Sequence, residues 1–302
     1  MSASDRAFVR HRWFSGLRVA ALVQNTFLEL VRMRVFYFVL LFALLVIGSS
    51  LFTVQFSFQD QFQVLKDVSL GAISIFSWLL GMLCTALLLP RDAEDRTLYT
   101  ILAKPVSRFE YLLGKMLGVF LLLAVAMGVM GALFLAVLSI REHQVLAEIA
   151  REAARQATPA EELVKQIADV RSAAFQWNLI PGLAVIYLKA VLCAALTLLI
   201  STFATSTVFT VLVSVLVYLI GHVQGLAREY WLRGGEASWL LKGALALVAL
   251  VFPDLQLFNV VDEIAVGTPV SPALFGQVAA FGLLYTVIYG LLAQVVFSSK
   301  EL

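Results

Sequence analysis

Long uncharged, apolar runs dominate the chain and limit what it can fold into. A helix needs roughly 20 apolar residues to cross the hydrocarbon layer of a bilayer. Five runs reach this length, and a sixth does so once the Ser and Thr before it are included; the predicted spans are 35–54, 70–89, 116–139, 183–204, 206–224 and 275–297. The sequence therefore predicts an all-α polytopic membrane protein with six transmembrane helices, residues 1–302 forming a single transmembrane domain.

Composition supports this class and argues against others. The chain is 61% hydrophobic and only 14% charged, whereas soluble proteins carry nearer one quarter charged residues. A net charge of +2 gives no reason to expect a nucleic-acid partner. The first apolar run begins near Val35 without a small-residue cleavage site, so we expect no signal peptide. Cys84 and Cys193 each stand alone in an apolar run, which is typical of buried packing rather than of a disulfide or metal site.

The apolar segment 239–258 is shorter than a span. Its uncharged part runs from Gly243 to Phe252 and is interrupted by Pro253. We interpret it as a re-entrant or interfacial segment before the last span. Counting it as a seventh span is the alternative, and that would move the C-terminus across the membrane.

The distribution of basic residues predicts the orientation. Six spans put both termini on one side of the membrane, and placing them inside gives 12 Lys or Arg inside against 9 outside. Cytoplasmic loops usually carry the excess of Lys and Arg. The sequence therefore predicts a multi-pass protein with both termini cytoplasmic.

The sequence predicts two helices in the polar segment 140–177. Thr158, Pro159 and Glu161 form a capping-box pattern at the start of the second helix. Apolar residues follow at helical spacing on both helices; they are Val145, Ile149, Leu163, Ile167, Val170 and Ala174. An extracytoplasmic hairpin packed on itself is the first interpretation, and a docking surface for a periplasmic partner is the alternative.

The spans lack an obvious energy source or catalytic group. They contain no Asp or Glu and one basic residue, Lys189, which can snorkel to the interface or have a functional role. The histidines His11, His143 and His222 are scattered, and no HExxH, GxSxG or P-loop motif occurs. We therefore expect a non-catalytic chain without a cofactor or metal of its own; if ATP drives it, another chain binds the nucleotide. Hydroxyl residues near the spans can pack helices or line a path; they are Ser49, Ser50, Ser201, Thr202, Thr205 and Ser206.

One dense polar stretch interrupts the apolar runs. Residues 91–115, RDAEDRTLYTILAKPVSRFEYLLGK, contain nine charged side chains. Asp92, Glu94 and Asp95 favour the start of a short helix, which should end at Lys104 because Pro105 follows. Ser107 and Glu110 form a capping box that starts a second helix leading into the third span.

The short helix has a small apolar face, made by Leu98, Ile101 and Leu102. An amphipathic segment resting on membrane lipids is one interpretation, and a helix docking on a soluble partner is the other. Four acids nearly cancel the five basic residues of 91–115, which disfavours anionic lipid. Upstream, residues 17–34 place Val19, Val23, Phe27 and Leu30 on one face, which predicts an N-terminal amphipathic elbow helix lying in the interface.

These stretches resemble the ABC-2-type transporter permeases. The acidic start with TLYTILAKPVSR (97–108) and EYLLGK (110–115) is similar to the coupling region of that family. ALVQNTFLELVRMRVFYFVLLFALLVI (21–47), FPDLQLFNVVDEIAVGTPV (252–270) and FSSKEL (297–302) resemble its elbow and first span, its segment before the last span and its C-terminus. Together they resemble the branch containing the permease of nitrous-oxide reductase maturation, from which the long 140–177 segment departs.

The resemblance implies partners and a site. It implies two copies of a separate ABC ATPase subunit that binds ATP and Mg, a second permease protomer in a homodimer, and the cytoplasmic (inner) membrane of a bacterium. The implied coupling helix contacts the ATPase through Glu94, Asp95, Arg96, Thr97, Leu98, Tyr99, Ile101, Leu102, Lys104, Pro105, Ser107 and Arg108. The implied elbow residues are Asn25, Glu29 and Arg32.

We therefore expect the permease subunit of an ATP-driven transporter that couples ATP hydrolysis to export or to conformational signalling across the membrane. A membrane scaffold or passive pore without an ATPase partner is the alternative function.

Overall fold

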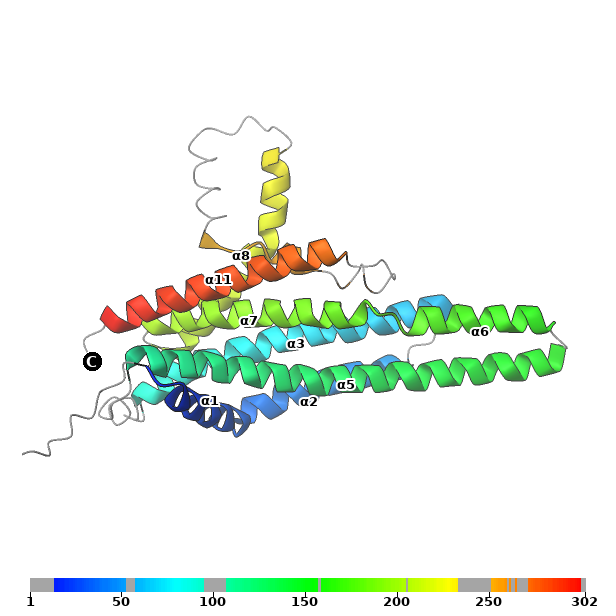
Figure 1. Ribbon diagram of the computed structural model, residues 1–302, viewed down its shortest axis with the longest axis horizontal. Coiled ribbons are helices and arrows are strands. Elements are labelled where there is room, and N and C mark those ends of the chain that lie inside the picture. The colour runs from blue at the N-terminus through cyan, green and yellow to red at the C-terminus, as the bar shows by residue number, and fades with distance from the viewer. Residues whose placement is uncertain are drawn as a thin grey trace, which may run out of the picture.

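The computed structural model describes residues 14–52, 58–94, 107–156, 159–204, 206–232, 251–259, 261, 264 and 271–299. The elements of this part are all helical; they are α1 (Gly16–Val31), α2 (Arg34–Ser49), η1 (Ser50–Phe52), α3 (Phe58–Glu94), α5 (Arg108–Gln156), α6 (Ala160–Ala174), α7 (Leu179–Phe203), α8 (Thr207–Leu232), η2 (Leu255–Phe258) and α11 (Pro272–Ser299) (Figure 1). Within it, six candidate membrane spans are long and apolar enough to cross a bilayer. The prediction of an all-α polytopic membrane protein is confirmed.

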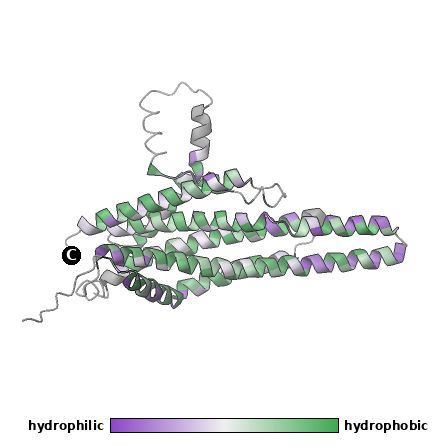
Figure 2. Ribbon diagram, viewed as in Figure 1, coloured by the Kyte–Doolittle hydropathy of each residue, from purple (hydrophilic) through white to green (hydrophobic). Residues whose placement is uncertain are grey.

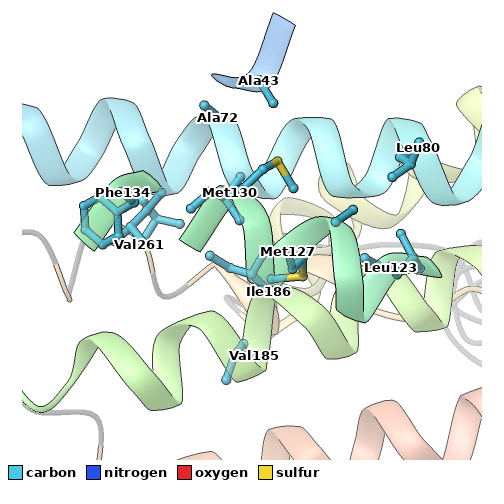
Figure 3. Packing of buried hydrophobic residues seen from close by; sticks show 14 of the residues in the cluster. Ala43, Ala72, Leu80, Leu123, Met127, Met130, Phe134, Val185, Ile186 and Val261 are labelled. Atoms are coloured by element: carbon cyan, nitrogen blue, oxygen red, sulfur yellow. The ribbon is translucent and has the colours of Figure 1, made fainter. Parts of the chain in front are cut away.

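The core lies where α3, α5 and α7 run side by side. Buried residues of α5 such as Met127, Met130 and Phe134 point between Ala72 of α3 and Ile186 of α7 (Figure 3). Helix α7 is buried along almost its whole length because α3, α5, α8 and α11 all pack against it. Helices α2, α8 and α11 keep large apolar side chains exposed on their outer faces, as expected where lipid surrounds them.

Helix α5 is much longer than a membrane span. Its 49 residues rise over about 74 Å, whereas the hydrocarbon layer is about 30 Å thick. Its second half carries the polar residues and lies beside α6, beyond the apolar part of the bundle (Figure 2). The first helix expected in 140–177 is therefore not separate but a direct continuation of the third span.

The α5–α6 extension packs on itself as predicted. Val145 and Ile149 of α5 are buried together with Val170 and Ala174 of α6, while Leu163 packs at the edge of the same cluster. Pro159 stands immediately before α6, and its expected capping partner Thr158 lies outside the described residues. At the base of the extension, the buried Lys66 of α3 donates to the carbonyl of Ala173 at 2.7 Å, in the last turn of α6. This bond ties the extension to the bundle.

At the polar end of α3 the structure differs from the prediction. The helix continues through Pro90 to Glu94, so Asp92 and Glu94 lie within α3 and do not begin a new helix. A proline disturbs the turn on its N-terminal side, whereas Ala and Glu after it favour continuation. The expected helix up to Lys104 and the turn at Pro105 lie outside the described residues.

The structure excludes one of the two alternatives for Lys189. Its side chain is 4% exposed and points into the bundle toward α8, so it does not snorkel to the interface. The segment before the last span is described only over 251–259, where Asp254 caps η2 by accepting from the backbone N–H of Gln256 at 3.0 Å. Gly221 of α8 lets Leu255 pack closely. Residues 239–250 lie outside the described part, so the re-entrant path stays a prediction.

Helix α1 packs along the first turns of α5. A Cβ atom added to Gly114 would lie 2.5 Å from Cβ of Leu22, and one added to Gly118 would lie 2.6 Å from Cβ of Thr26. Small residues four apart allow two helix backbones to approach closely. The amphipathic helix predicted near the N-terminus is present, with Val19 and Leu30 buried; its position in the membrane interface stays a prediction.

Gly118→Ala should destabilise the protein, because the new methyl group has no space against the stiff Thr26 side chain. We expect the free energy of unfolding to fall by about 1–3 kcal/mol, the usual cost of overpacking. The midpoint of thermal unfolding in detergent, followed by tryptophan fluorescence, measures this. Gly128→Ala on the same helix is the control, since nothing lies within 4 Å of its added Cβ; equal midpoints for the two variants would contradict the close approach.

Candidate functional site

The N-terminus of α5 is held by a capping box. Ser107 Oγ accepts from the backbone N–H of Glu110 at 3.1 Å, and Glu110 Oε2 accepts from the backbone N–H of Ser107 at 3.0 Å. This reciprocal pair satisfies backbone donors that the helix itself leaves unpaired. The capping box predicted at Ser107 and Glu110 is confirmed.

The same Glu110 carboxylate also holds the start of α1. Its Oε1 accepts from the backbone N–H of Ser15 at 2.7 Å and lies 2.9 Å from a guanidinium nitrogen of Arg18. The Glu110 side chain is 0% exposed. A carboxylate is favourable at a helix N-terminus, and here one carboxylate serves two of them. Glu110 therefore joins α1 and α5, and its burial is compensated by several donors.

A second ion pair lies further along the same interface. Lys115 Nζ of α5 donates to Glu29 Oε2 of α1 at 3.1 Å, and the Lys115 side chain is almost fully buried. The Lys115 ammonium also lies 5.7 Å from the centre of the Tyr111 ring. With Leu22 packed on Gly114 and Thr26 on Gly118, α1 and α5 are held together over several turns.

The C-terminal end of α11 joins the same place. Arg108 donates to the carbonyl of Ser298 at 2.7 Å, and the rings of Tyr111 and Phe297 stack with centroids 5.8 Å apart. We call this arrangement the α1–α5–α11 junction; its residues are Ser15, Arg18, Glu29, Ser107, Arg108, Glu110, Tyr111, Lys115, Phe297 and Ser298. Helix α5 begins and α11 ends at this end of the bundle, opposite the α5–α6 extension (Figure 1).

The structure brings only part of the predicted site together. Glu29, Ser107 and Arg108 belong to the junction, whereas Asn25 and Arg32 are exposed on and after α1. Glu94 is the last residue of α3. The remaining predicted coupling residues lie outside the described residues; they are Asp95, Arg96, Thr97, Leu98, Tyr99, Ile101, Leu102, Lys104 and Pro105.

Sequence reasoning missed the partners that hold the junction. Glu110 was expected to cap its own helix, but its contact with Arg18 joins residues far apart in the chain, and no local pattern signals it. Lys66 was missed for the same reason. Among the residues that the structure describes, no group of three His, Cys, Asp or Glu side chains could hold a metal ion. The arrangement suits mechanical connection between helices.

Glu110→Gln should loosen α1 from α5, because an amide offers one acceptor oxygen where the carboxylate offers two. We expect the free energy of unfolding to fall by about 1–3 kcal/mol, with faster hydrogen–deuterium exchange at the α1 amides and unchanged exchange in α6. Mass spectrometry of the exchanged protein measures both. Glu148→Gln, at an exposed position of α5, is the matched control; unchanged exchange in α1 of the Glu110 variant would contradict this role.

Comparison with known proteins identifies the family. The sequence matches the family described as ABC-2 family transporter protein over residues 47–295, which is most of the chain. A search of curated proteins finds no significant match. The matched region contains four of the six candidate spans whole, the end of the first and most of the last. The chain belongs to the ABC-2 family of transporter membrane proteins.

Proposed function

We propose that this chain is the permease subunit of an ABC transporter, moved by ATP hydrolysis in separate ATPase subunits. The observation that carries the proposal is the Glu110 contact, because it connects the start of α5 to α1. The segment 95–106 joins the end of α3 to this start. A force applied to 95–106 would therefore reach α1, α3, α5 and α11 together.

The ATPase contact belongs, in this proposal, to residues 94–108. The apolar side chains Leu98, Ile101 and Leu102 would enter a groove on the ATPase, and the surrounding charged residues would orient the contact. ATP and Mg would bind in the ATPase alone. Asn25 and Arg32, exposed beside the junction, would brace the same subunit.

The oligomer and the location follow from the family resemblance. We propose two permease protomers in a homodimer with two ATPase copies, in the inner membrane of a bacterium, with both termini cytoplasmic and in the branch of the nitrous-oxide reductase maturation permease. The α5–α6 extension would then lie on the outer side. Its rigid connection to the bundle through Lys66 supports a role in passing movement to a periplasmic partner.

Leu98→Asp and Pro105→Gly should uncouple the ATPase. We expect the stimulation of ATP hydrolysis by the permease to fall by about tenfold or more, because a charge would enter an apolar contact or the lever would lose stiffness. The measurement is ATP hydrolysis by the complex purified in mild detergent. Membrane insertion should be unchanged in both variants.

The control is Val164→Asp, at an exposed position of α6 on the far side of the protein. It should leave ATP hydrolysis unchanged. Stimulation equal to that of the unaltered chain in both test variants would reject the coupling role of 94–108. Purification without any ATPase would favour the scaffold or passive pore.

A further inference from the structure

Polar side chains line the contact between α7 and α8. Each helix contributes a residue every four positions, and the two sets run antiparallel. We call this the α7–α8 seam; it consists of Lys189, Cys193, Thr197 and Ser201 on α7 and of Thr210, Ser214, Tyr218 and His222 on α8. Lys189 Nζ lies 3.2 Å from His222 Nε2, which fixes the register. From that register we expect Cys193 to lie opposite Tyr218, Thr197 opposite Ser214, and Ser201 opposite Thr210.

A small cavity lies in the middle of the seam. Its lining includes Cys193, Thr197, Ser214 and Tyr218, so the central pairs do face one another. The cavity measures about 10 Å³, roughly the space of one water molecule. The rest of the lining is mostly apolar, so the seam residues supply most of the hydrogen-bonding groups that an occupant of this cavity would meet; the other lining residues are Trp78, Leu192, Leu196, Val217, Pro253 and Leu255.

Two hydroxyls of the seam have no partner. Ser201 Oγ and Ser214 Oγ are buried, with each side chain 3% exposed, and neither makes a hydrogen bond within the described part of the chain. Hydroxyls in membrane helices usually donate to a carbonyl three or four residues earlier, as Thr197 does to Cys193 at 2.9 Å. A buried unpaired hydroxyl is unfavourable. The seam therefore offers donors that its own backbone does not use.

Lys189 lies at one end of the seam, where it contacts His222 and Tyr218. His222 Nδ1 lies 3.0 Å from the carbonyl of Tyr218 and must carry the proton of that bond, so Nε2 is the acceptor facing Lys189. The Lys189 nitrogen also lies 5.5 Å from the centre of the Tyr218 ring, which stacks on Trp78. No carboxylate of the described residues forms a salt bridge with Lys189. Asp254, which lies near His222, accepts from the backbone N–H of Gln256 through one oxygen.

The position of Lys189 along α7 defines the inner end of the seam. Lys189 lies about 15 Å along the helix axis from the start of α7 at Leu179 and within the predicted span 183–204. From there the seam runs to Ser201, near the end of α7 that lies on the same side as the α1–α5–α11 junction. A buried cation is costly in a membrane and usually marks a functional site.

We propose that the α7–α8 seam is the binding path for a negatively charged group of the transported substrate, entered from the junction side and ending at Lys189. The Lys189 ammonium meets the anion at the inner end of the seam, and the unpaired Ser201 and Ser214 hydroxyls donate to it on the way. In the closed arrangement the seam has room only for water. This inference rests on the proposed transport function, because opening the seam requires movement of α7 against α8.

The test is the reaction of a cysteine in the seam with charged thiol reagents. In a chain carrying Cys84→Ser and Cys193→Ser, Ser214→Cys is treated with the anionic reagent MTSES or the cationic reagent MTSET. Leu216→Cys is the matched control at nearly the same depth on the exposed face of α8. Arg151→Cys, in the exposed part of α5, normalises the intrinsic rates of the two reagents.

During ATP hydrolysis by the complex, MTSES should react with Ser214→Cys about tenfold faster than with Leu216→Cys. It should also react several-fold faster than MTSET, because a fixed cation in a narrow path concentrates anions. Adding Lys189→Gln should bring the two normalised rates together. Protection by inorganic phosphate in phosphatidylcholine vesicles would identify a soluble anion, and protection only by phosphatidylglycerol would identify a lipid headgroup.

Equal rates for the two reagents in the chain that keeps Lys189 would overturn the anion site. No reaction at Ser214→Cys while ATP hydrolysis is intact would overturn the path and leave the proposed function standing. If no ATPase associates with the chain, the proposed function is rejected, and the seam proposal is judged separately. The seam is then tested in vesicles holding the permease alone, where absence of reaction overturns it as well.

Discussion

One buried carboxylate sets the geometry of the end of the molecule where α5 begins. Glu110 accepts hydrogen bonds from the starts of two helices and pairs with Arg18, so α1 and α5 share a single anchoring group. Removing a buried charge from its donors is costly, which makes this contact difficult to break without separating the helices. Arg108 and Phe297 extend the same connection to α11.

A displacement of the α1–α5–α11 junction would be transmitted through the fold to two distant regions, the α5–α6 extension and the α7–α8 seam. Helix α5 continues without interruption into the α5–α6 extension, and Lys66 ties that extension to α3. Helix α7 lies among α3, α5, α8 and α11, so a shift of these neighbours bears directly on the α7–α8 seam. The proposed function needs such stiffness, because it has the energy released in another chain.

The sequence predicts the helices better than their connections. Hydrophobic run length found the spans, and the pattern of Ser107 and Glu110 found the start of α5, because both depend on neighbouring residues. It placed a helix start at Asp92, where α3 in fact continues past Pro90, and it left open whether Lys189 reaches the membrane surface. Those outcomes depend on which helices pack together, as do the partners of Glu110 and Lys66. The four-residue spacing on α7 and α8 was visible, but its meaning required the register between the helices.

The most direct test of the central claim, that the junction moves as one body under an external ATPase, is a distance measurement between spin labels. Labels at the exposed Leu28 of α1 and Leu121 of α5 report within one protomer, and a label at Leu121 alone reports between the protomers of the proposed dimer. The account predicts an unchanged distance within the protomer, and a changed distance between protomers, when ATP is trapped in the complex. A nucleotide-dependent change between α1 and α5, with the distance between protomers constant, would contradict it.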